Sequence, residues 1–203
     1  AFTAADADSW LLSVDASQLE PGRHYHLCVD LDGSNLGALD VGDSGGPLIY
    51  ISPAEAGSVQ TVMEALGQTF VVSCVTGAAC ATSTAWHLVA GECGQPGEMP
   101  AADASGFFLK DQAGWVLAVD GQLLKPGAHY HLCLDVDGPL AKEFQSGDSG
   151  LQVYVSGVLL RSPAEIFAAS AEQLTLRCSL NGCPAGAMAW LAETCGSEMN
   201  VGQ

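Results

Sequence analysis

Positively charged residues are scarce in this chain. Its 203 residues include six Lys and Arg against 23 Asp and Glu, which gives a formal net charge of −17. None of the six lies between His24 and Leu109. Such a chain has little with which to bind nucleic-acid phosphates, and anionic lipid headgroups would repel it. The charge therefore argues against nucleic-acid binding and against electrostatic docking on a membrane.

Long apolar runs are missing as well. Nothing approaches the roughly 18–20 consecutive apolar residues that a membrane-spanning helix needs, so we expect no direct membrane span. Apolar residues nevertheless make up 48% of the chain, which is enough for a packed core. The length suits one large domain or two domains of about 100 residues each.

The chain is an internal tandem repeat. The segment His24 to Gly33, with the sequence His-Tyr-His-Leu-Cys-Val-Asp-Leu-Asp-Gly, recurs 105 positions later, from His129 to Gly138, with two substitutions. The offset is 104 from Tyr50 to Tyr154. All four Trp, all four Tyr and all eight Cys fall into pairs related by the repeat. Residues of these types build cores and disulfides, so the repeat indicates duplicated architecture and not one asymmetric catalytic centre.

Short apolar runs between turn signals predict an all-β chain. From Tyr25 to Leu31, apolar residues alternate with polar ones, which is the period of a half-buried strand. Pro-Gly, Asp-Gly and Asn-Gly pairs mark the turns. One stretch, 164–171, is expected to form about two turns of helix. Short strands at this spacing predict two tandem β-sandwich repeats stapled by disulfides.

The run Leu-x-Pro-Gly-x-x-Tyr-x-Leu-Cys, at 19–28 and again at 124–133, resembles the corner and penultimate strand of an immunoglobulin-like domain. The resemblance implies that residues 53–155 form one whole sandwich. Residues 1–52 and 156–203 would then be complementary fragments that close into a second sandwich. The alternative is two sequential repeats, 1–100 and 101–203.

The two chain ends match the junction between the repeats. Cys93 to Met99 leads into Ala-Ala-Asp-Ala at 101–104, and Cys195 to Met199 would lead into Ala-Ala-Asp-Ala at 4–7 if the termini were joined. We therefore expect that the chain corresponds to two periods of a longer array.

The even and high number of cysteines predicts disulfides and an oxidising compartment. Zinc would favour Cys-x2-Cys pairs, and the tightest spacings here are wider. We expect four disulfides, two in each repeat unit, from Cys28, Cys74, Cys80, Cys93, Cys133, Cys178, Cys183 and Cys195. Cys80 should pair with Cys93, and Cys183 with Cys195, because each pair encloses a short loop around a Trp.

The other four cysteines depend on the domain frame. The immunoglobulin-like frame implies Cys74–Cys133 and Cys28–Cys178, whereas the sequential frame implies Cys28–Cys74 and Cys133–Cys178. Cys28 is out of phase with Leu27 and Val29 and should face away from the core. A β-bulge or a different pairing would resolve this conflict.

The segment Gly42 to Pro47, Gly-Asp-Ser-Gly-Gly-Pro, resembles the nucleophile motif of chymotrypsin-like serine proteases. In that family a His and an Asp precede the Ser by a long stretch, and the Ser lies in the last third of the domain. Here only 41 residues precede the motif, and its second copy at 147–150 lacks the Gly-Pro. We interpret the motif as a tight turn, expect Ser44 to be inert and expect no enzyme; a serine hydrolase is the remote alternative.

Two further patterns suggest metal ligands. His24 and His26, like His129 and His131, lie on one strand face and could chelate Zn or Cu, but no third ligand is evident. Carboxylates at alternate positions suit calcium, although the spacing is not that of an EF-hand; the weak calcium candidates are Asp30, Asp32, Asp135 and Asp137. We interpret both patterns as structural and expect no cofactor and no metal.

The surviving interpretation is a non-catalytic structural or docking subunit that binds protein partners. The unit Tyr-x-Leu-Cys-x-Asp-x-Asp-Gly, at 25–33 and 130–138, resembles the cysteine-rich repeats of lumenal accessory subunits of dinoflagellate and other algal photosystem complexes. That resemblance implies a protein that caps the lumenal face of a photosynthetic membrane complex, in the thylakoid lumen. The alternative is a secreted, extracellular adhesion or ligand-binding repeat protein.

Overall fold

We analysed a computed structural model, which describes residues 2–4, 6, 9–32, 39–57, 59–75, 79–93, 103–112, 114–141, 145–162, 173–180, 182–189 and 191. These residues form β-strands and two short 3-10 turns, which confirms the predicted all-β class. None of the helical turns in the described ranges has the length and apolarity to cross a membrane. The helix predicted at 164–171 lies outside the described residues.

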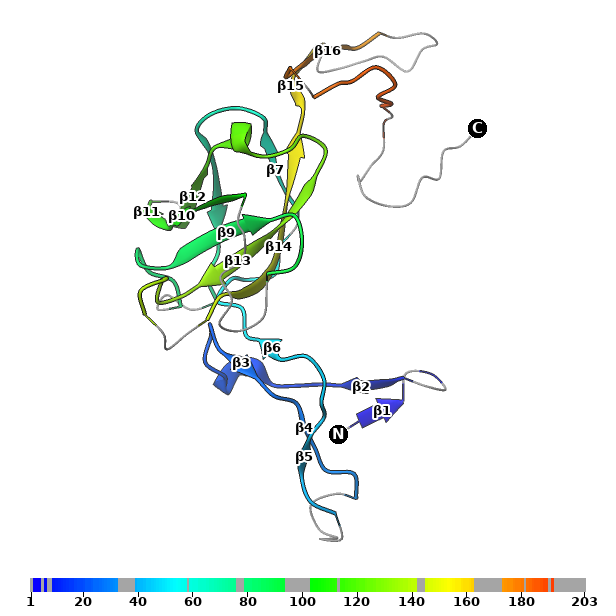
Figure 1. The fold of residues 1–203 in the computed structure, drawn as a ribbon, viewed down its shortest axis with the longest axis vertical. Coiled ribbons are helices and arrows are strands. Elements are labelled where there is room, and N and C mark those ends of the chain that lie inside the picture. Colours follow the sequence, from blue (N-terminus) through cyan, green and yellow to red (C-terminus); the bar gives the residue numbers. More distant parts are fainter. Residues whose placement is uncertain are drawn as a thin grey trace.

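The middle of the chain forms two sheets, which we call the central unit (Figure 1). One sheet has the order β10-β9-β13-β14-β7, and only its β14–β7 pair is parallel. The other has the order β11-β12-β8. The strands are β7 (Gln60–Met63), β8 (Gln68–Val72), β9 (Ala85–Val89), β10 (Ala104–Phe107), β11 (Leu109–Asp111), β12 (Gly114–Val119), β13 (His129–Asp135) and β14 (Gly147–Ser156), with the 3-10 turn η2 (Gly121–Leu123) after β12.

The core lies between these two sheets because strand side chains alternate between faces. Val72 and Leu117 of the smaller sheet pack in one cluster with Leu132, Leu134 and Val153 of the larger. Along β14 every second residue, from Gly147 to Val155, is buried. The strands of the central unit thus fall within the range for which one whole sandwich was expected, while the division of the chain into domains stays a prediction.

The residues before the central unit form short antiparallel pairs, which we call the N-terminal arm (residues 2–52). Its elements are β1 (Phe2–Ala4), β2 (Trp10–Leu12), η1 (Ala16–Gln18), β3 (His24–Tyr25), β4 (Cys28–Val29), β5 (Gly42–Asp43) and β6 (Ile49–Tyr50). The arm reproduces registers of the central unit. His24 lies opposite Tyr50 as His129 lies opposite Tyr154, and Cys28 opposite Asp43 as Cys133 opposite Asp148.

The turns of the arm also repeat those of the central unit. The Tyr25 hydroxyl accepts a hydrogen bond from the Glu20 amide at 3.0 Å, and the Tyr130 hydroxyl accepts one from the Lys125 amide at 2.9 Å. Both bonds span five residues across the Pro-Gly turn, where glycine supplies a positive φ. The N-terminal arm therefore has the local structure of one half of the central unit.

The residues after the central unit, 157–191, form what we call the C-terminal arm. β15 (Val158–Ser162) pairs antiparallel with β16 (Thr175–Cys178), and Cys178 bonds Cys183. This bond is the repeat equivalent of Cys74–Cys80 in the central unit. The two arms lie at opposite ends of the central unit along its long axis (Figure 1).

The disulfides form, but not with the predicted partners. The three bonds among the described cysteines are Cys74–Cys80, Cys93–Cys133 and Cys178–Cys183. The predicted Cys80–Cys93 and Cys183–Cys195 pairs are wrong, and so are the Cys74–Cys133 and Cys28–Cys178 pairs and the alternative Cys28–Cys74 and Cys133–Cys178 pairs. Cys28 carries a free, exposed thiol. Cys195 lies outside the described residues.

Strand pairing explains the largest correction. β9 runs antiparallel beside β13, with His87 opposite Cys133, and the residues that follow β9 stay beside β13, where Cys93 bonds Cys133. Tyr130, Leu132 and Leu134 of β13 face the main core, so Cys133, which is out of phase with them, faces the other side of the sheet. There it packs with Cys93 and Val89 in a separate small cluster. The equivalent Cys28 is out of phase with Leu27 and Val29 in the same way and is exposed, as expected from strand alternation without a β-bulge.

Candidate functional site

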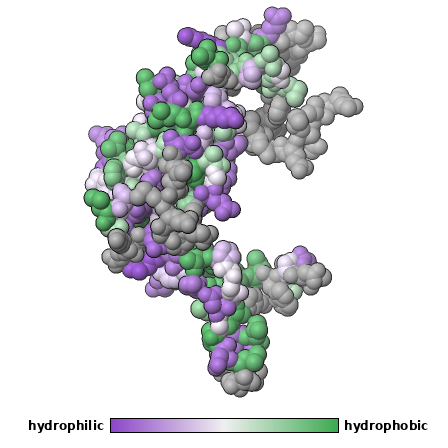
Figure 2. All heavy atoms as spheres, viewed as in Figure 1, coloured by the Kyte–Doolittle hydropathy of each residue, from purple (hydrophilic) through white to green (hydrophobic). Residues whose placement is uncertain are grey.

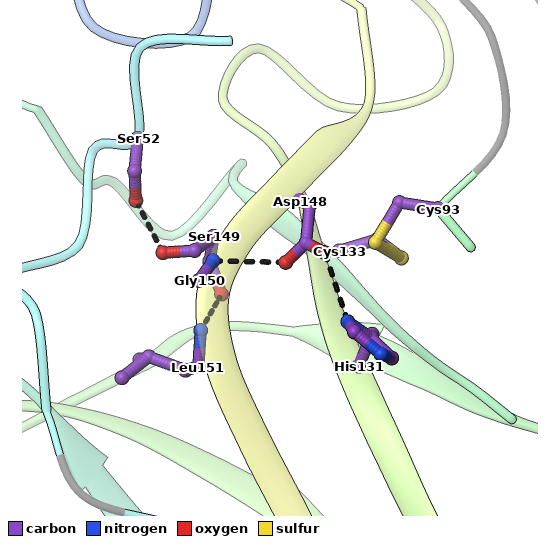
Figure 3. A network of polar contacts seen from close by, with 8 residues as sticks. All are labelled: Ser52, Cys93, His131, Cys133, Asp148, Ser149, Gly150 and Leu151. Atoms are coloured by element: carbon purple, nitrogen blue, oxygen red, sulfur yellow. Dashed lines mark hydrogen bonds and ion pairs between the residues drawn. A yellow bond between two sulfur atoms is a disulfide. The ribbon is translucent and has the colours of Figure 1, made fainter. Parts of the chain in front are cut away.

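The candidate site is the place where the Gly-Asp-Ser-Gly segment pairs with the His-x-His strand, and it occurs twice. In the central unit, His131 Nδ1 lies 2.9 Å from Asp148 Oδ2 (Figure 3). In the N-terminal arm, His26 Nδ1 lies 2.6 Å from Asp43 Oδ2. Both pairs are cross-strand contacts between exposed or half-exposed side chains.

The Asp of each segment also shapes the backbone. Asp148 Oδ1 accepts a hydrogen bond from the Gly150 amide at 2.8 Å, and Asp43 Oδ1 accepts one from the Gly45 amide at 2.9 Å. Gly150 and Gly45 have φ values of 76° and 70°, which only glycine adopts without strain. The Gly45 amide lowers the pKa of Asp43, and His26 lowers it further. The predicted tight turn is therefore present in both copies.

The serine of the motif points away from the histidine. Asp148 is exposed whereas Ser149 is buried, because neighbouring strand residues face opposite sides of the sheet (Figure 3). Ser149 Oγ accepts a hydrogen bond from the Leu151 amide at 3.1 Å. Ser44 Oγ accepts one from the Gly46 amide at 3.3 Å. A Ser-His-Asp triad needs the histidine between the other two groups, and neither copy of this site has that arrangement.

The remaining histidines of the His-x-His strands pack against tyrosines. The His24 and Tyr50 rings are 4.9 Å apart between centroids, and the His129 and Tyr154 rings are also 4.9 Å apart. Burial lowers the pKa of His24. Each His-x-His pair thus has one ring contact and one carboxylate contact. Within the described ranges, no three His, Cys, Asp or Glu side chains come together in a way that could hold a metal ion.

The structure brings two of the four calcium candidates together. Burial, together with the neighbouring Asp137 carboxyl, raises the pKa of Asp135 to about 6. Asp135 Oδ1 accepts a hydrogen bond from the Gly138 amide at 3.1 Å, which closes the turn after β13. In the N-terminal arm, Asp32 Oδ2 accepts a bond from the Leu39 amide at 2.8 Å. Asp135 and Asp32 thus have structural contacts, and the expectation that none of the four candidates holds a metal stays a prediction.

Sequence reasoning missed the contact between the arm and the central unit, which we call the tyrosine joint. The Tyr50 hydroxyl donates a hydrogen bond to the Leu134 carbonyl at 2.9 Å, and the Tyr50 ring covers Gly147 so closely that a Cβ there would overlap it. Ser52 Oγ donates to the Ser149 carbonyl at 2.9 Å (Figure 3). Burial raises the pKa of Tyr50, so its hydroxyl stays protonated. The sequence signal that could have indicated this contact is that Tyr50 and Gly147 both have identical repeat equivalents, Tyr154 and Gly42.

Comparison with known proteins adds no relative to this picture. No protein-family model, no curated protein and no solved structure matches the chain.

Proposed function

We propose that this chain is a non-catalytic structural or docking subunit of an oxidising compartment, built from tandem immunoglobulin-like sandwich units. Three disulfides among the described residues are consistent with that compartment. Proteins of the reducing cytosol seldom keep such bonds.

One observation carries the non-catalytic part of the proposal. The His and Asp side chains that resemble catalytic or metal-binding groups occur twice, and they make the same contacts in both places. His131 and His26 pair with carboxylates, His129 and His24 pack on tyrosines, and both Gly-Asp-Ser-Gly segments form the same turn. Because the same contacts recur in both copies, their role is to stabilise the paired strands and the turns between them.

The immunoglobulin-like architecture is supported by topology. The central unit has two sheets around one core, with a parallel pairing between its first and last strands, β7 and β14. Tyr130 makes the backward hydrogen bond to the Lys125 amide that is typical of the tyrosine corner in such domains. The disulfides differ from the inter-sheet bridge of antibody domains.

A protein partner is the proposal for the subunit function, and the acidic chain supports it by suiting neither nucleic acid nor anionic lipid. The first candidate partner is the lumenal face of a photosynthetic membrane complex, because the units at 25–33 and 130–138 resemble the repeats of lumenal accessory subunits of algal photosystems. A secreted adhesion protein is the second candidate, since the same disulfides and sandwiches suit the extracellular space.

The test is purification of the chain from its source, with mass spectrometry of its companions. A stoichiometric membrane complex supports the subunit function, whereas a soluble carbohydrate or protein ligand supports adhesion. The non-catalytic claim is tested with a fluorophosphonate probe on the wild type and on Ser44→Ala and Ser149→Ala. Labelling that Ser44→Ala or Ser149→Ala abolishes would overturn it.

A further inference from the structure

The N-terminal arm exposes apolar positions whose equivalents are buried in the central unit. Ile49 is 45% exposed, whereas its repeat equivalent Val153 is fully buried. The same contrast holds for Cys28, which is exposed, and Cys133, which is fully buried. Apolar side chains are visible on the surface of this arm (Figure 2). The arm thus has one half of a sandwich without the half that would cover it.

The C-terminal arm carries a strand of the complementary half. Leu174 and Leu176 of this arm are 40% and 41% exposed, whereas their equivalents Phe70 and Val72 are buried in β8. In the central unit β8 pairs with β12, with Phe70 opposite Leu117. Transferred by the repeat, this pairing sets Leu174 opposite Leu12 of the N-terminal arm. Within the described residues, the C-terminal arm therefore carries the equivalent of β8, and the N-terminal arm carries the equivalent of its partner β12.

The tyrosine joint shows how consecutive units contact each other. Tyr50 covers Gly147 and donates to the Leu134 carbonyl. The repeat equivalents of these three residues are Tyr154, Gly42 and Val29. A Cβ added at Gly42 would meet no atom within 4 Å in the described residues, so the position that a tyrosine covers at Gly147 is open at Gly42. By the repeat, Gly42 corresponds to the position that would receive a tyrosine in a second joint.

The unoccupied position at Gly42 is better filled by a second copy of the chain than by the C-terminal arm of the same chain. The arm that carries Gly42 lies at one end of the central unit, and the C-terminal arm lies at the other end (Figure 1). We propose that the C-terminal arm of one copy completes the N-terminal arm of the next, with Tyr154 of the first copy packed on Gly42 of the second. Such head-to-tail contacts produce a ring or an open filament.

The repeat also assigns a disulfide to this interface. Cys93 bonds Cys133, and the equivalents of these residues are Cys195 and Cys28. The assignment for Cys195 comes from the repeat alone. The two thiols would lose two protons and two electrons to a disulfide oxidant, such as oxidised glutathione, which is reduced to two thiols. The bond would link Cys195 of one copy to Cys28 of the next.

The experiment mixes unlabelled and ¹⁵N-labelled chains, refolds them together in a glutathione redox buffer, and measures mass by light scattering and disulfides by peptide mapping. We expect oligomers, and Cys28–Cys195 peptides that join one light and one heavy segment. Monomers with this bond inside one chain, or with any other partner for Cys28, would overturn the proposal. It rests on the sandwich architecture proposed above, but not on the absence of catalysis, so probe labelling and assembly can fail independently.

A matched pair of variants tests the joint itself. Gly42→Ala adds a methyl group where a single copy has open space, so each chain should fold and melt as the wild type does. The same methyl should obstruct Tyr154 of the next copy and weaken association by at least about tenfold. Gly91→Ala, also at an open position, is the control and should assemble normally. Equal association of the two variants would exclude the tyrosine joint as the contact between copies.

Discussion

Removing Cys93–Cys133 should destabilise the chain more than removing Cys74–Cys80. The first bond joins residues 40 apart in sequence and the second joins residues 6 apart. In the chain-entropy model, the first closes a loop worth about 4 kcal/mol and the second about 2 kcal/mol. We therefore expect the Cys93→Ala, Cys133→Ala variant to lose about 2 kcal/mol more than the Cys74→Ala, Cys80→Ala variant.

The assay is urea unfolding under oxidising conditions, followed by tryptophan fluorescence, to which the buried Trp86 contributes, and every chain carries Cys28→Ala so that no disulfide between Cys28 and Cys195 joins two copies. The same chain without the two paired substitutions, under a strong reductant, is the control and should be at least as unstable as the less stable variant, because it loses all three bonds. Both pairs include fully or nearly fully buried sulfurs, so cavity effects act on both variants. Equal losses, or a larger loss for the Cys74–Cys80 pair, would refute the loop-entropy reasoning.

Two further substitutions test the core and the acidic turn. Gly106→Ala would place a Cβ 2.7 Å from the buried Trp86 ring, so unfolding titrations should show a loss of about 1–3 kcal/mol, and an unchanged midpoint would contradict the packing. The folded-state pKa of Asp135 is raised to about 6, so the folded chain binds more protons than the unfolded chain between pH 4 and 6, and stability falls as pH rises through that window. The Asp135→Asn variant does not titrate at this position and so does not lose this stability. The free energy of unfolding of the variant minus that of the wild type should therefore increase from pH 4 to pH 7. A difference that stays constant over this range would rule out the shifted pKa.

The sequence was sufficient for the features that depend on local pattern. Alternation from Tyr25 to Leu31 and the Gly-Asp-Ser-Gly turn need only neighbouring residues, and the structure has both strands and turns there. The repeat added long-range information, because equivalent residues make equivalent contacts. The immunoglobulin-like assignment, the domain frame and the function stay predictions, since no comparison addresses them.

Which strands and cysteines pair over long distances in the chain could not be predicted from the sequence. Cys80 and Cys93 enclose a short loop around Trp86, and this proximity in sequence made them appear natural partners. In the structure Cys80 bonds Cys74 at the near side of that loop, while β9 carries the chain beside β13 and brings Cys93 to Cys133. Which strand lies beside β9 depends on packing across the whole unit, and spacing between cysteines contains no such information.

The tyrosine joint is built without an ion, and this has a consequence for a chain with a net charge of −17. Its contacts are two hydrogen bonds to carbonyl groups and one aromatic ring over a glycine. Salt does not screen such contacts, but it does screen the repulsion between neighbouring acidic surfaces. Units joined in this way should therefore associate more readily in a saline medium than in a dilute one, the opposite of what ion-paired assemblies do.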